Sequence, residues 1–340
     1  MKLVNLSFHI VTEGEFAIHR HRHLSNKKIF SALHNSLEVK HLQLVYRLPS
    51  GRLEEDNDFY FRSRSKYVSF PLLRFLSKMK PDIVFAHSFN FPVQLLILQI
   101  LLPKTTKFFI QHHAEKPFTG LFKRMLQKYA YRRAHLYFFA SHDLAIPFIQ
   151  RGIIKNATPV REMMEISTDF SQSEKDAARN GLALSGGAIF LWVGRLDQNK
   201  DPLTVLKAID TLKDTGVGFR LYMLYSSKDM EVQVREFINN HRLSKFVELP
   251  GCLPNQELPK WFSAADYYIS ASHYEGSGVA LCEAMACGCV PIVTNIPSFR
   301  TMTRNGECGF LYPPGDSDRL AAILEEAIKT NAHKKLSEKA

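Results

Sequence analysis

The segment Glu275-Gly276-Ser277-Gly278-Val279-Ala280-Leu281-Cys282-Glu283 follows an apolar run, residues 267–271, and leads into a helix-like run, residues 283–286. This order predicts a strand, a glycine turn and the start of a helix. Gly276 and Gly278 lack a Cβ, so the backbone can approach a ligand closely, and the free N–H groups of the helix start favour an anion. The carboxylates of Glu275 and Glu283 can accept hydrogen bonds from hydroxyls on either side of a bound phosphate. A sugar, a phosphate and a ribose fit this order.

A second strand and loop lie about eighty residues upstream. The apolar run 189–193 continues into Gly194-Arg195-Leu196-Asp197-Gln198-Asn199-Lys200 and then into an amphipathic stretch, residues 203–212. Arg195 and Lys200 therefore follow the carboxyl end of a predicted buried strand. A guanidinium can contact two oxygens and an ammonium supplies a point charge, so this pair suits a diphosphate.

Together these motifs resemble the retaining glycosyltransferases of family 4, whose fold is called GT-B. The resemblance rests on Gly194-Arg195-Leu196 with Lys200, on Glu275 and Glu283 as E-x7-E, and on the stretches 284–288, 291–293 and 309–316. It implies two Rossmann-like parallel-sheet domains that face a central cleft. It also implies transfer of a sugar from a nucleotide diphosphate sugar to an acceptor hydroxyl with retention, in the synthesis of a surface polysaccharide or glycolipid.

The resemblance also implies a role for each matching residue. Arg195 and Lys200 would bind the donor diphosphate, Glu275 the hydroxyls of the donor sugar, and Glu283 the ribose. His112 or His113, which follow the predicted strand 107–111, would face the donor sugar. The donor would also contact the turn and helix-start residues Gly194, Gly276, Ser277, Gly278, Val279 and Ala280. The donor would be a UDP- or GDP-sugar and the acceptor a sugar or a lipid-linked sugar, with no cofactor.

Two departures from the family pattern keep other functions open. The loop Thr12-Glu13-Gly14-Glu15 has one glycine where the family usually has a glycine-rich loop, and residues 165–169 lack the usual Asn-Gly. A nucleotide-sugar epimerase of the same fold, or a binding protein without turnover, therefore remains an alternative.

The domain organisation follows from strands that alternate with helical patterns twice over. Expected strands are residues 3–10, 42–46, 83–86, 107–111 and 136–140, followed by 188–193, 219–224, 246–249, 267–270 and 290–294. We expect an acceptor-side domain over residues 1–168, a linker over 169–187 and a nucleotide-sugar domain over 188–340. Relatives usually finish with a helix that returns to the first domain, and here we expect that helix to be short or truncated.

Charge is divided unevenly along the chain. Residues 1–170 contain 25 Lys and Arg against 13 Asp and Glu, a net charge of +12, whereas residues 171–340 have a net charge of −1. An anionic membrane surface fits the basic half, and no nucleic-acid module is recognisable. No apolar run is long enough to span a bilayer and the start does not read as a signal peptide, so we expect a cytoplasmic protein, attached peripherally to the inner face of the membrane.

Two polar stretches could suggest metal ions. His19-Arg20-His21-Arg22-His23 is open to three readings: a solvated basic face, which we favour, a phosphate clamp, or a metal tract. Asp56-Asn57-Asp58 resembles the Asp-x-Asp pair of the other large glycosyltransferase fold, but no buried strand precedes it. We expect a solvated loop there and catalysis without a protein-bound metal.

Overall fold

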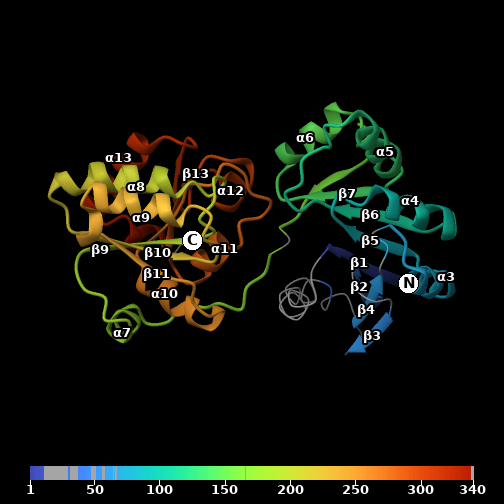
Figure 1. Ribbon diagram of the computed structural model, residues 1–340, viewed down its shortest axis with the longest axis horizontal. Helices are drawn as coiled ribbons and strands as arrows, with labels where there is room; N and C mark the ends of the chain where they lie inside the picture. The colour runs from blue at the N-terminus through green and yellow to red at the C-terminus, as the bar shows by residue number, and fades with distance from the viewer. Residues whose placement is uncertain are drawn as a thin grey trace. The chain divides into compact units, whose positions relative to one another are not determined.

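The computed structural model describes residues 1–10, 30, 37–46, 51–55, 58–63, 65, 67–164 and 166–337. The chain divides into two compact units, Met1–Ser167 and Thr168–Ala340 (Figure 1). Each unit is built on its own sheet, and each is described below by itself.

The first unit contains a sheet of eight strands in the order β3-β4-β2-β1-β5-β6-β7-β8. All neighbours pair in parallel except β3 and β4. The strands are β1 Lys2–Ile10, β2 Glu38–Tyr46, β3 Gly51–Glu55, β4 Asp58–Ser63, β5 Ile83–His87, β6 Lys107–Gln111, β7 Leu136–Phe139 and β8 Val160–Glu162. The helices with described bounds are α3 Phe70–Met79, α4 Pro92–Leu101, α5 Leu121–Tyr131 and α6 His142–Gln150.

The hairpin of β3 and β4 corrects one expectation. Asp58, which we placed in a solvated loop, opens β4 and is buried, as are Phe59, Tyr60 and Phe61 behind it. These three consecutive aromatic residues have high strand propensity and bury a large area, which outweighs the polar run before them. Asp56 and Asn57, the loop 12–15 and the stretch His19–His23 lie outside the described residues.

The second unit contains a parallel sheet of six strands in the order β11-β10-β9-β12-β13-β14. The strands are β9 Ala188–Gly194, β10 Phe219–Tyr225, β11 Val247–Gly251, β12 Tyr267–Ser270, β13 Val290–Thr294 and β14 Phe310–Tyr312. The α-helices are α7 Lys175–Gly181, α8 Pro202–Leu212, α9 Glu231–Asn240, α10 Leu258–Ala264, α11 Val279–Ala286, α12 Pro297–Met302, α13 Ser317–Lys329 and α14 His333–Leu336.

Apolar cores lie on both faces of this second sheet. Along β9, Phe190 and Trp192 pack into one core, which includes side chains of α8 and α13, while Ile189 and Leu191 pack into the other. Successive side chains of a strand point to opposite faces, so a strand covered by helices on both sides is apolar at nearly every position. The expected strand at 188–193 has this composition and is present as β9.

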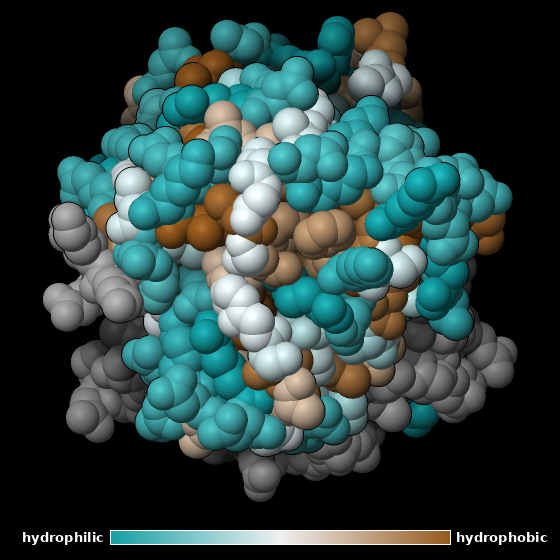
Figure 2. Space-filling view, turned by 90° about the vertical axis from the view of Figure 1, so that its left-hand side faces the viewer, coloured by the Kyte–Doolittle hydropathy of each residue, from teal (hydrophilic) through white to brown (hydrophobic). Residues whose placement is uncertain are grey.

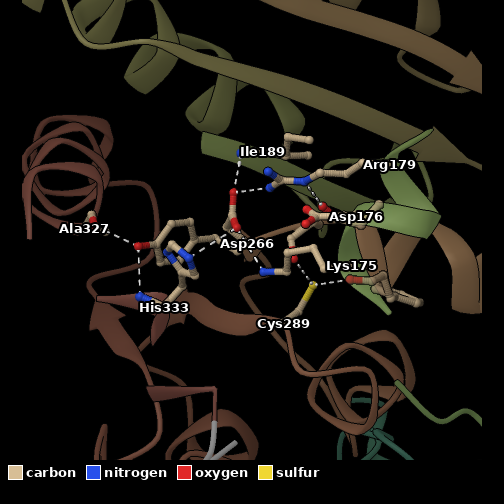
Figure 3. A network of polar contacts seen from close by, with 12 residues as sticks. Lys175, Asp176, Arg179, Ile189, Asp266, Cys289, Ala327 and His333 are labelled. Carbon is tan, nitrogen blue, oxygen red and sulfur yellow. Dashed lines mark hydrogen bonds and ion pairs between the residues drawn. The ribbon is translucent and has the colours of Figure 1, made fainter. Parts of the chain in front are cut away.

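The stretch 169–187, which we expected to be a linker, belongs to the second unit and contains α7. Lys175 and Arg179 of this helix extend to the buried carboxylate of Asp266, at N–O distances of 3.0 and 2.6 Å (Figure 3). Asp266 also accepts a hydrogen bond from the N–H of Ile189 at 2.8 Å. Lys175 and Arg179 thus attach α7 to the sheet through an ion-pair cluster.

Helix length bears on membrane insertion. Within the described residues, none of the helices has both the length and the apolar character needed to span a bilayer.

Candidate active site

The candidate site lies where the strand order of the second sheet reverses direction. β9 is flanked by β10, which follows it in the chain, and by β12, which comes after a long interval. At such a switch point the loops after the two central strands diverge and leave room for a ligand at the carboxyl ends of the strands. β9 ends at Gly194, the loop after it carries Arg195 and Lys200, and the loop after β12 carries Glu275 and the glycine turn.

Arg195 is presented on the outside of its loop. Its side chain is 60% exposed, and Nη2 lies 3.1 Å from Oδ2 of Asp197. Asp197 also accepts a hydrogen bond through Oδ1 from the backbone N–H of Lys200, at 2.9 Å. Asp197 therefore orients the guanidinium and shapes the turn that carries Lys200, while leaving the outer nitrogens of Arg195 open to an anion.

Lys200 and Glu275 form a direct ion pair across the two loops. Both side chains are partly buried, so the pair is shielded from solvent more than a surface pair would be. The amide of Asn199 donates to the carbonyl of Tyr274 at 2.9 Å, and the N–H of His273 donates to the carbonyl of Asn199 at 2.8 Å. These bonds hold the two loops edge to edge, so the cation and the carboxylate keep a fixed separation.

The glycine turn requires glycine at position 278. Gly278 is the N-cap of α11 and has φ +65°. Residues other than glycine rarely adopt this left-handed backbone conformation. A Cβ there would also lie 2.7 Å from the ring of Phe299. The carbonyl of Gly278 accepts from the N–H groups of Leu281 and Cys282, and the first N–H groups of α11 point beyond the helix start. Val279 is 56% exposed, so this end of the helix is open to an anion.

Three other elements support the loop that follows β12. Thr294 of β13 donates through its hydroxyl to the carbonyl of Ser272 at 2.6 Å, and Tyr312 of β14 donates to the carbonyl of Ser270 at 3.0 Å. Ser298, near the start of α12, donates to the carbonyl of Glu275 at 3.2 Å. The backbone that carries Glu275 is therefore anchored on both sides of the glutamate.

Glu283 lies one turn inside α11, in a poorly hydrated environment. Burial raises the pKa of Glu283 to about 7, far above the usual value for a glutamate. Desolvation disfavours the carboxylate, and the neutral acid prevails in slightly acidic solution. A ligand hydroxyl that donates a hydrogen bond to Glu283 favours the charged form, so we expect ligand binding near neutral pH to release a proton.

We therefore expect Glu283→Gln to stabilise the fold in alkaline solution. The folded protein keeps the proton to higher pH than the unfolded chain does, so the penalty of ionising Glu283 grows as pH rises through 4.5 to 7 and is complete above that range. The gain should reach about 3 kcal/mol at pH 8 and shrink as the pH falls toward 4.5. Urea unfolding of both proteins across this range measures it, and a gain independent of pH would contradict the assignment.

The two predicted histidines of the first unit differ sharply. His112 is buried, with its ring stacked on Phe139 at a centroid distance of 4.7 Å and set edge-on to Phe148. Its Nε2 lies 2.8 Å from the carbonyl of Glu115, to which it donates. These contacts are those of a packing residue. His113 is partly exposed and remains the candidate of the two for contact with a ligand.

A chain of buried polar groups orients His113. Nε2 of His113 lies 2.7 Å from Nδ1 of His87, and Nε2 of His87 lies 2.5 Å from Oδ1 of Asn5. With the amide oxygen of Asn5 facing it, His87 carries its proton on Nε2 and accepts through Nδ1 from His113. Asn5 in turn donates to Nδ1 of His41 at 3.0 Å, which extends the chain across three strands.

The structure thus joins Gly194, Arg195, Lys200, Glu275, the glycine turn and Glu283 in one site on the second unit, and sets His112 and His113 in the first. The sequence motifs did not reveal Asp197, Ser298 or the chain from Asn5 to His113. Asp197 could have been noticed, because Asp at the start of a turn commonly accepts a backbone N–H two or three residues later. The other contacts join segments distant in the chain and left no local signal.

The family described as "Glycosyl transferases group 1" matches residues 174–340. A protein of Salmonella typhimurium named as a colanic acid biosynthesis glycosyltransferase, WcaL, is 33% identical over 141 residues, 39% of this chain and 34% of its own length. The amylovoran biosynthesis glycosyltransferase AmsK of Erwinia amylovora is 30% identical over 196 residues, 55% of this chain and 47% of its own length. The matched segments therefore span half or less of these relatives.

Solved structures extend the likeness to both units. The sucrose-phosphate synthase of Thermosynechococcus elongatus has a TM-score of 0.73 at 17% identity, over 99% of this chain and 92% of its own. The HepE protein of Anabaena, solved in complex with UDP and glucose, has a TM-score of 0.73 at 16% identity over the same shares. At such identities the likeness concerns the fold, which is GT-B. Residues 174–340 are therefore similar to the group 1 glycosyl transferases, and the two units of the chain share the GT-B fold.

Proposed function

We propose that this protein transfers a sugar from a nucleotide diphosphate sugar to an acceptor hydroxyl with retention, in the synthesis of a surface polysaccharide or glycolipid. The observation that carries the proposal is the convergence of Arg195, Lys200 and the open start of α11 at the switch point of the second sheet, with Glu275 and Glu283 on either side. Two cations and a helix N-terminus suit a diphosphate, and the carboxylates suit hydroxyls beside it.

The comparisons support the same chemistry. HepE was solved with UDP and glucose, WcaL and AmsK are named for the synthesis of bacterial polysaccharides, and a mannosyltransferase of Escherichia coli named for the O-antigen chain is 24% identical over 149 residues. A relative in Xanthomonas campestris is named for transfer from GDP-mannose to a cellobiosyl-diphosphopolyprenol. We propose a donor of the same class and a sugar or lipid-linked acceptor.

In this function the residues stabilise charge that develops on the leaving diphosphate. The bond from the anomeric carbon to the diphosphate breaks, and negative charge grows on the phosphate oxygens beside Arg195, Lys200 and the N–H groups of α11. Donors that are already in place need no reorganisation as this charge appears. Glu275, anchored through its carbonyl by Ser298, would meanwhile hold the sugar hydroxyls.

Screening nucleotide sugars tests this function. UDP- and GDP-sugars are compared first by thermal stabilisation of the protein, and those that bind are incubated with glycan and glycolipid acceptors. A glycosylated product with the anomeric configuration of the donor is the expected result. A free epimer would establish the epimerase alternative, and binding without any product from all acceptors would favour a binding protein. An inverted product would overturn retention.

The two carboxylates should respond differently to removal of charge. We expect Glu275→Gln to reduce sugar transfer while leaving the affinity for the bare nucleoside diphosphate nearly unchanged, because that ligand lacks the sugar. Glu283→Gln should weaken both the nucleoside diphosphate and the complete donor by about tenfold to a hundredfold, the scale of a hydrogen bond to a charged group. Isothermal titration with each ligand checks this, and the reverse pattern would exchange the two roles.

A further inference from the structure

Helix α5 of the first unit turns an apolar face to solvent. Its inner face buries Gln127, Ala130 and Tyr131 against the unit. The side chains on its outer face are 67, 78, 62 and 57% exposed, in the order Leu121, Phe122, Met125 and Tyr129. A helix on the surface of a globular protein normally places polar residues there. The outer face of α5 therefore suits contact with an apolar surface.

Exposure of large apolar residues is concentrated in this unit. Of the twelve such side chains exposed among the described residues, ten belong to residues 1–167 and two, Val232 and Val279, to the second unit. On the face of the second unit seen in Figure 2, hydrophilic residues cover most of the surface around a central apolar area. Gln99 of α4 donates a hydrogen bond to the carbonyl of Ala130 of α5 at 3.1 Å, so these two helices are neighbours. The next residue of α4, Ile100, is 79% exposed.

Cations border the apolar face on one side. Arg124 and Lys128 lie one turn apart on α5, and with Arg151, which follows α6, they line an open cavity of about 350 Å³. Arg151 is oriented by hydrogen bonds from Nη1 to the carbonyls of Pro117 and Phe118, at 3.2 and 3.3 Å. Residues 116–135 contain six Lys and Arg and no Asp or Glu. In the part of the chain that the structure describes, no carboxylate forms an ion pair with Arg124, Lys128 or Arg151.

We propose that α5 docks this protein on an anionic lipid bilayer. Leu121, Phe122, Met125 and Tyr129 enter the boundary between headgroups and acyl chains, and a lipid phosphate occupies the cavity between Arg124, Lys128 and Arg151. A helix of eleven residues, about 16 Å long, lies flat in that boundary. A second copy of the chain fits the face less well, because a symmetric contact would set these cations against each other.

This inference rests on the proposed function in one respect: a lipid-linked acceptor brings the enzyme to a membrane. Apart from that, the surface stands on its own geometry. We considered the clustered cations of the basic half for membrane contact. Of these, Lys123, Arg124, Lys128, Arg132 and Arg133 are exposed on α5 or directly after it. Arg62 of β4, also considered, is only partly exposed, and Arg20, Arg22, Lys27, Lys28, Arg64 and Lys66 lie outside the described residues.

Co-sedimentation of the full chain with vesicles tests the proposal. We expect binding to phosphatidylcholine vesicles that contain phosphatidylglycerol, release by high salt, and little binding to pure phosphatidylcholine. R124Q/K128Q should lower the partition coefficient about thirtyfold, the factor that corresponds to about 1 kcal/mol for each charge at an anionic surface. F122S/M125S should lower it by at least about tenfold through lost apolar burial. K207Q/K245Q, which removes two exposed lysines of the second unit, is the matched control and should bind as the unaltered protein does.

Three outcomes would overturn the proposal: equal binding to both kinds of vesicle, equal losses in R124Q/K128Q and in the control, or self-association through α5 in sedimentation velocity without vesicle binding. Nucleotide-sugar binding by titration, without vesicles, is measured on the same proteins. Vesicle binding without nucleotide-sugar binding would overturn the proposed function and leave the docking surface in place. Nucleotide-sugar binding without vesicle binding would overturn the docking surface and leave the proposed function in place.

Discussion

Replacing Arg195 or Lys200 by alanine should lower turnover by about 10²–10³-fold, the scale for loss of one preorganised charge donor at a developing anion. The effect should appear mainly in kcat, because charge on the diphosphate grows as the bond to the sugar breaks. The Arg195 side chain is 60% exposed, so its loss should leave the fold intact. Steady-state kinetics with a saturating acceptor measures the change.

Control variants separate the effect of removing the positive charge from the effect of removing side-chain volume. Lys200→Ala also leaves Glu275 without its ion-pair partner, so Lys200→Met, which keeps most of the side-chain volume, should be as inactive as Lys200→Ala. Lys207→Ala, which removes an exposed lysine from the neighbouring helix α8, should keep full turnover. Full activity in both Arg195→Ala and Lys200→Ala would remove the assignment of a diphosphate to this site.

Asp266→Ala should destabilise the second unit by about 3 kcal/mol, because it leaves Lys175 and Arg179 without their shared carboxylate and the N–H of Ile189 without an acceptor. Burial alone would raise the pKa of Asp266, but Lys175, the Ile189 N–H and Arg179 together lower it below the usual value. The stability that this ionisation contributes is present above the unfolded-state pKa and is lost as the pH falls through the folded-state pKa. Urea unfolding at neutral and acidic pH measures both effects.

The matched control for Asp266 is Asp210, which also bonds to two basic side chains, Lys213 and His241. Asp210 lies near the surface, where such pairs contribute about 1 kcal/mol or less. Asp210→Ala should therefore cost much less than Asp266→Ala. Hydrogen exchange should also show faster opening of α7 in Asp266→Ala alone. Equal losses in the two variants would mean that the cluster in Figure 3 is no stronger than a surface pair.

Much of the fold could be predicted because its signals are local. A strand covered on both sides is apolar along its length, and a glycine turn before a helix has a recognisable composition, so β9, β12 and the loops after them were found. The three-residue strands β8 and β14 are too short for a pattern to emerge, and the polar run before β4 concealed the hairpin. The helix α7 was mistaken for a linker, because its partner Asp266 lies 91 positions after Lys175.

The identity of the candidate-site residues was also local information: Arg195, Lys200, Glu275 and Glu283 follow or flank strand ends that composition alone locates. Their relations to one another depend on the tertiary structure. Lys200 and Glu275 are 75 positions apart and form an ion pair only because β9 and β12 are neighbours in the sheet. Likewise the pKa of Glu283 and the contrast between buried His112 and partly exposed His113 depend on packing and access to water, which are set by distances in space and not by distances along the chain.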